Sequence, residues 1–79
     1  MFTVYVLKSL NDHKKYIGFT SDLSRRITEH NNGLVKSTKH RKPLELVYYE
    51  EYKTKAEAMK REKFFKSGKG REFLNNLGI

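Results

Sequence analysis

Three short runs of β-branched and aromatic residues constrain the fold of this chain more than any other feature of its sequence. The runs are FTVYVL at residues 2–7, KYIGF at 15–19 and LELVYYEEY at 44–52, and each has the composition of a β-strand. Turn-forming residues at 11–13 separate the first two runs, which predicts a β-hairpin. We therefore expect a small three-stranded antiparallel sheet.

One helix is predicted between the second and third strands, from about residue 23 to residue 31. Ser21 or Asp22 can accept a hydrogen bond as its N-cap, and Gly33 ends it. The connector that follows is polar and basic and has no periodicity, and Pro43 closes it before the third strand begins.

A second helix is predicted after the third strand. Thr54 and Glu57 have the spacing of a capping box, in which each side chain binds the backbone amide of the other residue. They predict a helix from about residue 55 to residue 66, ended by a left-handed cap at Ser67-Gly68, and a last short helix over residues 71–77. The order ββαβα(α) predicts an α+β domain with helices packed against the sheet.

The chain has no cysteine, so disulfides, thiol nucleophiles and thiolate zinc sites are excluded. Its 79 residues are enough for one domain, which we expect to span residues 1–79. No apolar run approaches the roughly 18 residues of a membrane span, and no charged segment precedes an apolar one at the N-terminus. We therefore expect a mature, soluble protein of the cytoplasm.

The balance of charge points to a polyanionic partner. Seventeen Lys and Arg residues stand against nine Asp and Glu residues, which leaves a net charge of +8. Disordered tails can be equally basic, but here 37% of the residues are hydrophobic and they recur periodically, as in a folded domain. Nucleic acid is the first partner to consider, and an anionic membrane surface is the alternative.

The first predicted helix carries two polar residues beside its apolar face. Leu23 and Ile27 are one turn apart and face the sheet, while Arg26 and His30 are one turn apart on an adjoining edge. These two residues are expected at the border between core and solvent, near the strand that supplies Tyr16. The alternative is that both are ordinary solvated residues of a helix surface.

The second predicted helix has a carboxylate within its apolar stripe. Ala58, Met59 and Phe65 mark the stripe, and Glu62 falls between them. An inward-facing carboxylate is unfavourable unless it is paired or binds a metal. The alternative is an i,i+4 ion pair between Glu62 and Lys66 on a less buried face, worth about 0.3–0.5 kcal/mol.

Several other kinds of site find little support in the sequence. His13 and His40 lie in predicted loops and, with His30, show no metal-ligand spacing. The chain also has no glycine-rich phosphate loop, no GxSxG elbow and no paired helical carboxylates. Nucleoside triphosphate binding, acyl transfer and two-metal chemistry are therefore poorly supported.

Taken together, these motifs resemble those of the GIY-YIG nuclease superfamily over nearly the whole chain. The YIG half is Tyr16-Ile17-Gly18, and the GIY half is present as Thr3-Val4-Tyr5. Arg26 and His30 match the family's arginine and the histidine or tyrosine that follows it. Glu62 fits the metal-binding glutamate in an Ala-x-x-x-Glu pattern. In detail the chain is similar to the small stand-alone bacterial members, which resemble the catalytic domain of the excision-repair incision nuclease.

The sequence departs from the family pattern at three places. Thr3 replaces the glycine of the GIY half, and Phe19 stands where some members have a lysine directly after YIG. Many members also have an asparagine after the glutamate helix, and either Asn75 or Asn76 could correspond to it. Whether one of these asparagines takes part in a site stays open at this stage.

The resemblance implies metal-dependent phosphodiester hydrolysis. Tyr16 would act as general base with Tyr5 nearby, and because a free phenol has a pKa of about 10, this role requires neighbouring positive charge. Arg26 would hold the phosphate oxygens, and His30 would help move the proton. Glu62 would bind one divalent metal ion, Mg²⁺ or Mn²⁺.

The expected partner is nucleic acid, with DNA ahead of RNA, and the expected selectivity is for structure rather than base sequence because backbone contacts carry no sequence information. Two further readings stay open: a DNA- or RNA-binding module that has lost its chemistry, and a nuclease subunit that needs a protein partner. The residues expected to contact the nucleic acid are all basic, one from the first helix and four from the connector: Arg25, Lys36, Lys39, Arg41 and Lys42.

Overall fold

The computed structural model describes all residues from 1 to 79 and has the predicted element order. The fold is α+β, with three strands and three helices, as expected from the sequence. The elements in chain order are β1 (Phe2–Ser9), β2 (Lys15–Thr20), α1 (Leu23–Asn31), β3 (Leu44–Tyr52), α2 (Lys55–Lys66) and α3 (Gly68–Asn76).

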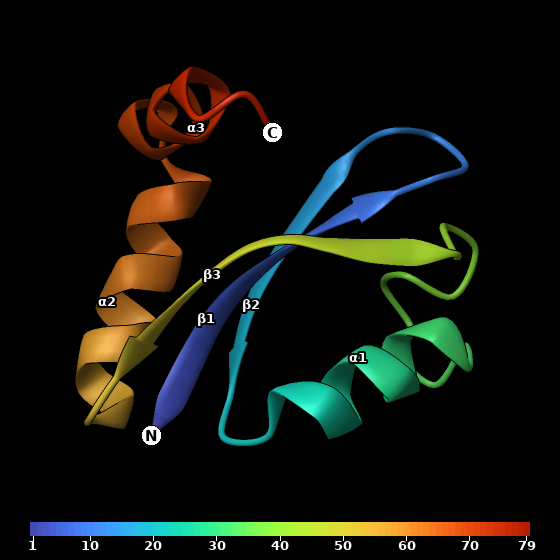
Figure 1. The fold of residues 1–79 in the computed structure, drawn as a ribbon, viewed down its shortest axis with the longest axis horizontal. Helices are drawn as coiled ribbons and strands as arrows, with labels where there is room; N and C mark the ends of the chain where they lie inside the picture. The colour runs from blue at the N-terminus through green and yellow to red at the C-terminus, as the bar shows by residue number, and fades with distance from the viewer.

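The sheet is antiparallel, with the strand order β2-β1-β3. Helix α1 covers one face, and α2 with α3 lies on the other side of the sheet (Figure 1). Because the central strand β1 is covered on both faces, residues 3–7 are all buried. This explains why the first apolar run is nearly continuous rather than alternating with polar residues.

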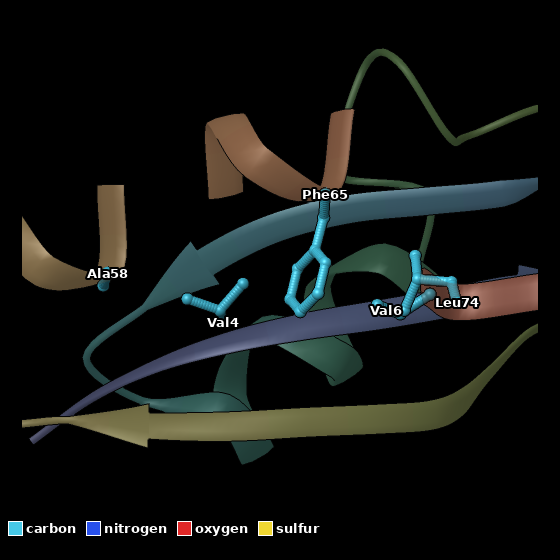
Figure 2. Close-up of a cluster of buried hydrophobic side chains, with 5 residues drawn as sticks. All are labelled: Val4, Val6, Ala58, Phe65 and Leu74. Carbon is cyan, nitrogen blue, oxygen red and sulfur yellow. The ribbon is translucent and has the colours of Figure 1, made fainter. Parts of the chain in front are cut away.

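The side chains of β1 divide between two hydrophobic clusters, as the two-residue period of a strand requires. Val4 and Val6 pack with Ala58 and Phe65 of α2 and with Leu74 of α3. Figure 2 shows the Phe65 ring pointing from α2 toward the sheet between these residues. The second cluster, on the α1 face, is formed by Tyr5, Leu7 and Leu44, with Leu23 and Ile27 packed against it.

Local signals set the ends of the helices. Asp22 is the N-cap of α1 and accepts a hydrogen bond from the backbone N–H of Arg25. Both halves of the predicted capping box are present at α2, between Thr54 and Glu57. These first-turn amides would otherwise lack partners, so a short polar side chain at the right spacing is enough to start each helix.

Two local predictions were wrong. Ser67 has an extended backbone rather than a left-handed cap, because it ends α2 and is also the N-cap of α3, where it accepts from the N–H of Gly70. As a result, α3 begins at Gly68, earlier than expected. Met59 lies outside the apolar stripe, with 43% of its surface exposed, since the part of α2 that faces the sheet is narrow.

No helix has the length and apolar character needed to cross a bilayer.

Candidate active site

The pairing of β1 with β2 brings the two motif tyrosines to one face of the sheet. Tyr5 lies opposite Gly18, and Leu7 lies opposite Tyr16. The Tyr5 ring passes directly over Gly18, where a Cβ atom would lie 2.5 Å from the Tyr5 hydroxyl oxygen. The glycine of the YIG motif therefore makes room for the tyrosine of the other half of the motif.

Helix α1 places His30 against both tyrosine rings. Its Nε2 lies 3.0 Å from the Tyr5 hydroxyl, and its Nδ1 lies 2.7 Å from the Thr38 hydroxyl. The ring centroids of His30 and Tyr16 are 4.9 Å apart, in an edge-to-face arrangement. His30 was predicted at the border with solvent, and that prediction was wrong. The residue is fully buried, because the connector after α1 folds over it and supplies Thr38.

The hydrogen bonds of His30 favour one tautomer. The Thr38 hydroxyl can donate to the Val35 carbonyl, which lies 3.5 Å away. The arrangement that uses every proton then has His30 Nδ1–H donating to Thr38, while the Tyr5 hydroxyl donates to His30 Nε2. Burial lowers the pKa of His30, and the positive charge of Arg26 lowers it further. The ring is therefore neutral at pH 7, as this arrangement requires.

The two tyrosines differ in what their hydroxyls can reach. Tyr5 has 1% of its surface exposed, and its hydroxyl is engaged by His30. Tyr16 is half-buried, and its hydroxyl has no hydrogen-bond partner within the protein. Only Tyr16 can therefore present its oxygen to a water molecule or to a bound substrate.

Arg26 extends from α1 and interacts electrostatically with both tyrosines. Its Nη1 donates to Glu29 at 3.1 Å, one turn further along the helix. Interaction with the Tyr5 hydroxyl raises the pKa of Arg26, with Glu29 adding to the effect. Burial raises the pKa of Tyr5, and the neighbouring Arg26 guanidinium opposes that rise. Roughly a third of the Arg26 side chain stays exposed, so it is held in place and still accessible.

Glu62, the remaining predicted site residue, belongs to α2. Its negative charge is among those that raise the pKa of Tyr5, so the two side chains lie within electrostatic range of each other. The Glu62 side chain is 21% exposed, and its Oε2 lies 3.7 Å from Lys66 Nζ. The sequence suggested either an inward-facing carboxylate or an ion pair with Lys66. Each describes part of the structure, because the Glu62 carboxylate is partly buried and also forms a long ion pair with Lys66.

No cluster of three or more His, Cys, Asp or Glu side chains is present that could enclose a metal ion. The carboxylate of Glu62 nevertheless suits Mg²⁺ or Mn²⁺, since such ions retain several waters and commonly take one or two protein carboxylates together with substrate phosphates. Its one ion pair is long, and one carboxylate oxygen is outside that pair. The donor chemistry therefore fits a single divalent ion whose coordination is completed by substrate and water.

The basic residues predicted to contact nucleic acid have different environments. Arg25 is exposed and forms only a 3.8 Å ion pair with Glu29. The three connector lysines are exposed and belong to no ion pair. Arg41 instead holds the connector to the β1–β2 hairpin, through Asp12 at 3.3 Å and the Lys15 carbonyl at 3.3 Å. Its charge is already compensated within the protein.

Two residues around the site were not predicted from the sequence. Thr38 lies in a connector without periodicity, so no local signal places its hydroxyl against His30. Glu29 could have been inferred from its i,i+3 spacing to Arg26. The two asparagines also separate here: Asn75 accepts a hydrogen bond from Lys15 Nζ at 3.2 Å and lines a groove beside Tyr16, whereas Asn76 is simply exposed.

Comparisons with known proteins identify the family of the chain. The family model of the GIY-YIG catalytic domain matches residues 1–76. A UPF0213 protein of Staphylococcus epidermidis is 52% identical over 60 residues, which cover 75% of this chain and 72% of that protein. A UPF0213 protein of Listeria welshimeri is 46% identical over 63 residues, covering 78% and 69%.

A solved structure agrees with the fold as well. The solution structure of a UPF0213 protein from Bacillus halodurans superposes with a TM-score of 0.59 at 37% identity, covering 98% of this chain and 85% of that one. The family match spans nearly all of the chain and includes both halves of the tyrosine motif. The chain therefore belongs to the GIY-YIG family of nuclease domains and is a relative of the small UPF0213 proteins.

Proposed function

We propose that this protein is a metal-dependent endonuclease that hydrolyses phosphodiester bonds, with Tyr16 as general base. One observation carries the proposal: two tyrosines, an arginine and a histidine from three elements converge at one place, and the Glu62 carboxylate of a fourth lies within electrostatic range of them. Side chains that served only for packing would not need this combination of charge and hydrogen bonding.

As the Tyr16 oxygen takes up the proton of the attacking water, the hydroxyl releases its own proton to bulk solvent, because it has no acceptor within the protein and is free to reach water. Tyr5 and His30 form a buried hydrogen-bonded pair beside it, with Thr38 holding the imidazole in a single tautomer. Their rings contact the Tyr16 ring and fix its direction. In this arrangement Tyr5 and Thr38 are positioning residues, and His30 Nε2 accepts the hydrogen bond of the Tyr5 hydroxyl.

Arg26 binds the phosphate oxygens that gain charge in the transition state, a role that suits its planar, permanently charged guanidinium. Glu29 binds Nη1 of this guanidinium, which also interacts with the Tyr5 hydroxyl, and the side chain stays partly exposed. Glu62 holds the divalent ion, Mg²⁺ or Mn²⁺. When bound, the ion supplies charge stabilisation for the leaving oxygen.

DNA is the proposed substrate ahead of RNA, and it is recognised by its structure rather than by its base sequence. Arg25 and the connector lysines Lys36, Lys39 and Lys42 are exposed and can contact the sugar-phosphate backbone. Contacts of this kind do not discriminate between bases.

The test is a cleavage assay with branched, gapped, nicked and single-stranded DNA in Mg²⁺ and in Mn²⁺. We expect Glu62→Gln and Tyr16→Phe each to reduce cleavage by about 10²–10³-fold. Binding in EDTA should stay within about twofold of the unmodified protein, since neither change removes a cation. The matched controls are Glu72→Gln, an exposed acid of α3, and Tyr49→Phe, an exposed phenol of β3.

Cleavage by the Glu62→Gln variant at the rate of the unmodified protein would refute the assigned role of this carboxylate. If the unmodified protein binds these substrates but releases no product from any of them, the catalytic proposal fails as a whole. That outcome would instead support a nucleic-acid-binding module on the same fold.

A further inference from the structure

A groove of about 600 Å³ runs between β2 and the junction of α2 with α3. Its apolar lining comes from Ile17 of β2, Phe65 of α2 and Leu74 of α3. It therefore depends on α3, which packs tightly against the end of α2, where a Cβ atom on Gly70 would clash with the Phe64 carbonyl oxygen. We call this feature the basic groove.

The polar lining of the basic groove is cationic. Lys14 and Lys15 come from the hairpin, Lys66 is the last residue of α2, and Arg71 belongs to α3. No carboxylate is among the lining residues. Lys14, Lys15 and Arg71 take part in no ion pair, so their charges are not compensated within the protein. Unpaired cations that line one depression favour a ligand with several negative charges.

The basic groove reaches the candidate active site. Tyr16 lines the groove and is also the tyrosine whose ring contacts His30. Lys66, on the other wall, lies 3.7 Å from the Glu62 carboxylate. A chain of phosphates that occupied the groove would therefore pass the proposed base and the lysine that is paired with the proposed metal-binding carboxylate.

The size of the basic groove indicates which polyanion fits. Its volume falls within the range of about 300–1,000 Å³ found for sites that hold small organic ligands, which is the scale of a nucleotide unit. A double helix cannot enter such a depression, whereas a single strand can place phosphates on the cations and a sugar or base against the partly exposed Tyr16 and Ile17. Cationic grooves with apolar or aromatic surfaces are the usual means of holding single strands.

We propose that the basic groove binds one unpaired strand of the nucleic-acid substrate on one side of the scissile phosphate. This deepens the proposed function and rests on it for the position of that phosphate, while strand binding itself does not depend on catalysis. The substrate class is then nucleic acid with a single-stranded arm, such as a flap, overhang or gap, rather than continuous duplex. Duplex regions contact the connector lysines on α1's side of the site.

The experiment measures binding in EDTA, by fluorescence anisotropy, of a labelled oligothymidine and of a labelled hairpin duplex over a range of salt concentrations. The groove variant is Lys14→Ala/Arg71→Ala, and the control is Lys53→Ala/Lys55→Ala, which removes two exposed cations at the far end of α2. We expect the groove variant to lose about tenfold in single-strand affinity and about 1.4 in the log–log salt slope, 0.7 for each lost phosphate contact.

Its affinity for the duplex should change by less than about twofold, and the control variant should bind both probes normally. A second readout does not depend on variants: the amide signals of residues 13–17 and 66–75 should shift when oligothymidine is added to the labelled protein. Equal loss of single-strand and duplex affinity in the groove variant would overturn the proposal. Unchanged amide signals on both walls of the groove would overturn it as well.

The two proposals fail in different ways. If the protein cleaves nothing but its groove variant loses strand binding selectively, the groove proposal stands and the nuclease proposal fails. If the protein cleaves continuous duplex as fast as a flapped substrate, and its groove variant binds oligothymidine normally, the nuclease proposal stands and the groove proposal fails.

Discussion

At the scale of single residues, the site depends on a hydroxyl that lies outside every recognised motif. Thr38 Oγ1 lies 2.7 Å from His30 Nδ1, and both residues are fully buried. Thr38→Val keeps the shape of the side chain and removes the hydroxyl, which leaves a buried N–H of the imidazole without a partner. We expect this to lower the free energy of unfolding by about 1–3 kcal/mol, measured by chemical denaturation.

The matched variant is Thr38→Ser, which keeps the hydroxyl and should cost less than about 1 kcal/mol. The nitrogen chemical shifts of the His30 ring report its tautomer independently of the stability of the protein. The Nδ1–H tautomer should dominate in the unmodified protein and in Thr38→Ser, but not in Thr38→Val. If the valine variant kept both its stability and that tautomer, Thr38 would have no role in orienting His30.

At the scale of secondary-structure elements, what could be predicted from the sequence was local. Asp22, Thr54 and Glu57 act within three residues of themselves, so their spacing alone identified the starts of α1 and α2. The start of α3 was missed because Ser67-Gly68 was interpreted only as the end of α2, whereas Ser67 is also the N-cap of α3, through its hydroxyl that accepts from the N–H of Gly70. One short polar residue thus serves two helices, and helix propensity does not report this.

The candidate site shows the same division. Arg26 and His30 are four residues apart on one helix, so their closeness to each other was predictable from the helical period. Their closeness to Tyr5 followed from the family resemblance rather than from spacing. The burial of His30 could not be predicted, because it depends on where the aperiodic connector lies, and only the folded chain determines that.

Helix α2 is attached to the sheet by an ion pair that none of the proposed functions uses. Arg61 donates to Glu50 of β3 at 2.8 and 3.2 Å, and its guanidinium lies over the Phe64, Phe65 and Phe73 rings at 4.6–5.1 Å. Burial alone would raise the pKa of Glu50, but hydrogen bonds from Arg61 and two tyrosines lower it below its usual value. The pair thus stays charged at pH 7 and fixes the helix that carries Glu62.

We expect Arg61→Ala to lower the free energy of unfolding by about 2–3 kcal/mol, since it removes two charge-assisted hydrogen bonds and the contact with three rings. Arg61→Lys keeps the charge without the planar fork and should fall between the two proteins. The neighbouring exposed Lys60→Ala is the control, with an expected change within about 0.5 kcal/mol. Denaturant midpoints that place Arg61→Ala beside Lys60→Ala would show that the pair does not hold the helix.

At the scale of the whole molecule, the net charge of +8 is carried by a body with a radius of gyration of 12.0 Å. The Debye length is about 10 Å at 0.1 M ionic strength and about 30 Å at 0.01 M, so at low salt nearly all of these charges repel one another. Salt would also screen the three pairs within α1 and α2, but such pairs contribute little, with a median of about 0–1 kcal/mol. The partly buried Arg41–Asp12 and Arg61–Glu50 pairs are screened much less. Repulsion is therefore the larger effect.

The protein should accordingly become more stable as salt is added. We expect the unfolding temperature to rise by about 2–8 °C between 10 and 300 mM NaCl, which corresponds to roughly 0.5–1 kcal/mol for a domain of this size. Lys53→Glu/Lys55→Glu reverses two exposed charges away from the basic groove and should show a smaller rise, measured by calorimetry. A fall in unfolding temperature with added salt would mean that the native ion pairs outweigh the repulsion. The cations of the basic groove would then be compensated within the protein, contrary to what strand binding requires.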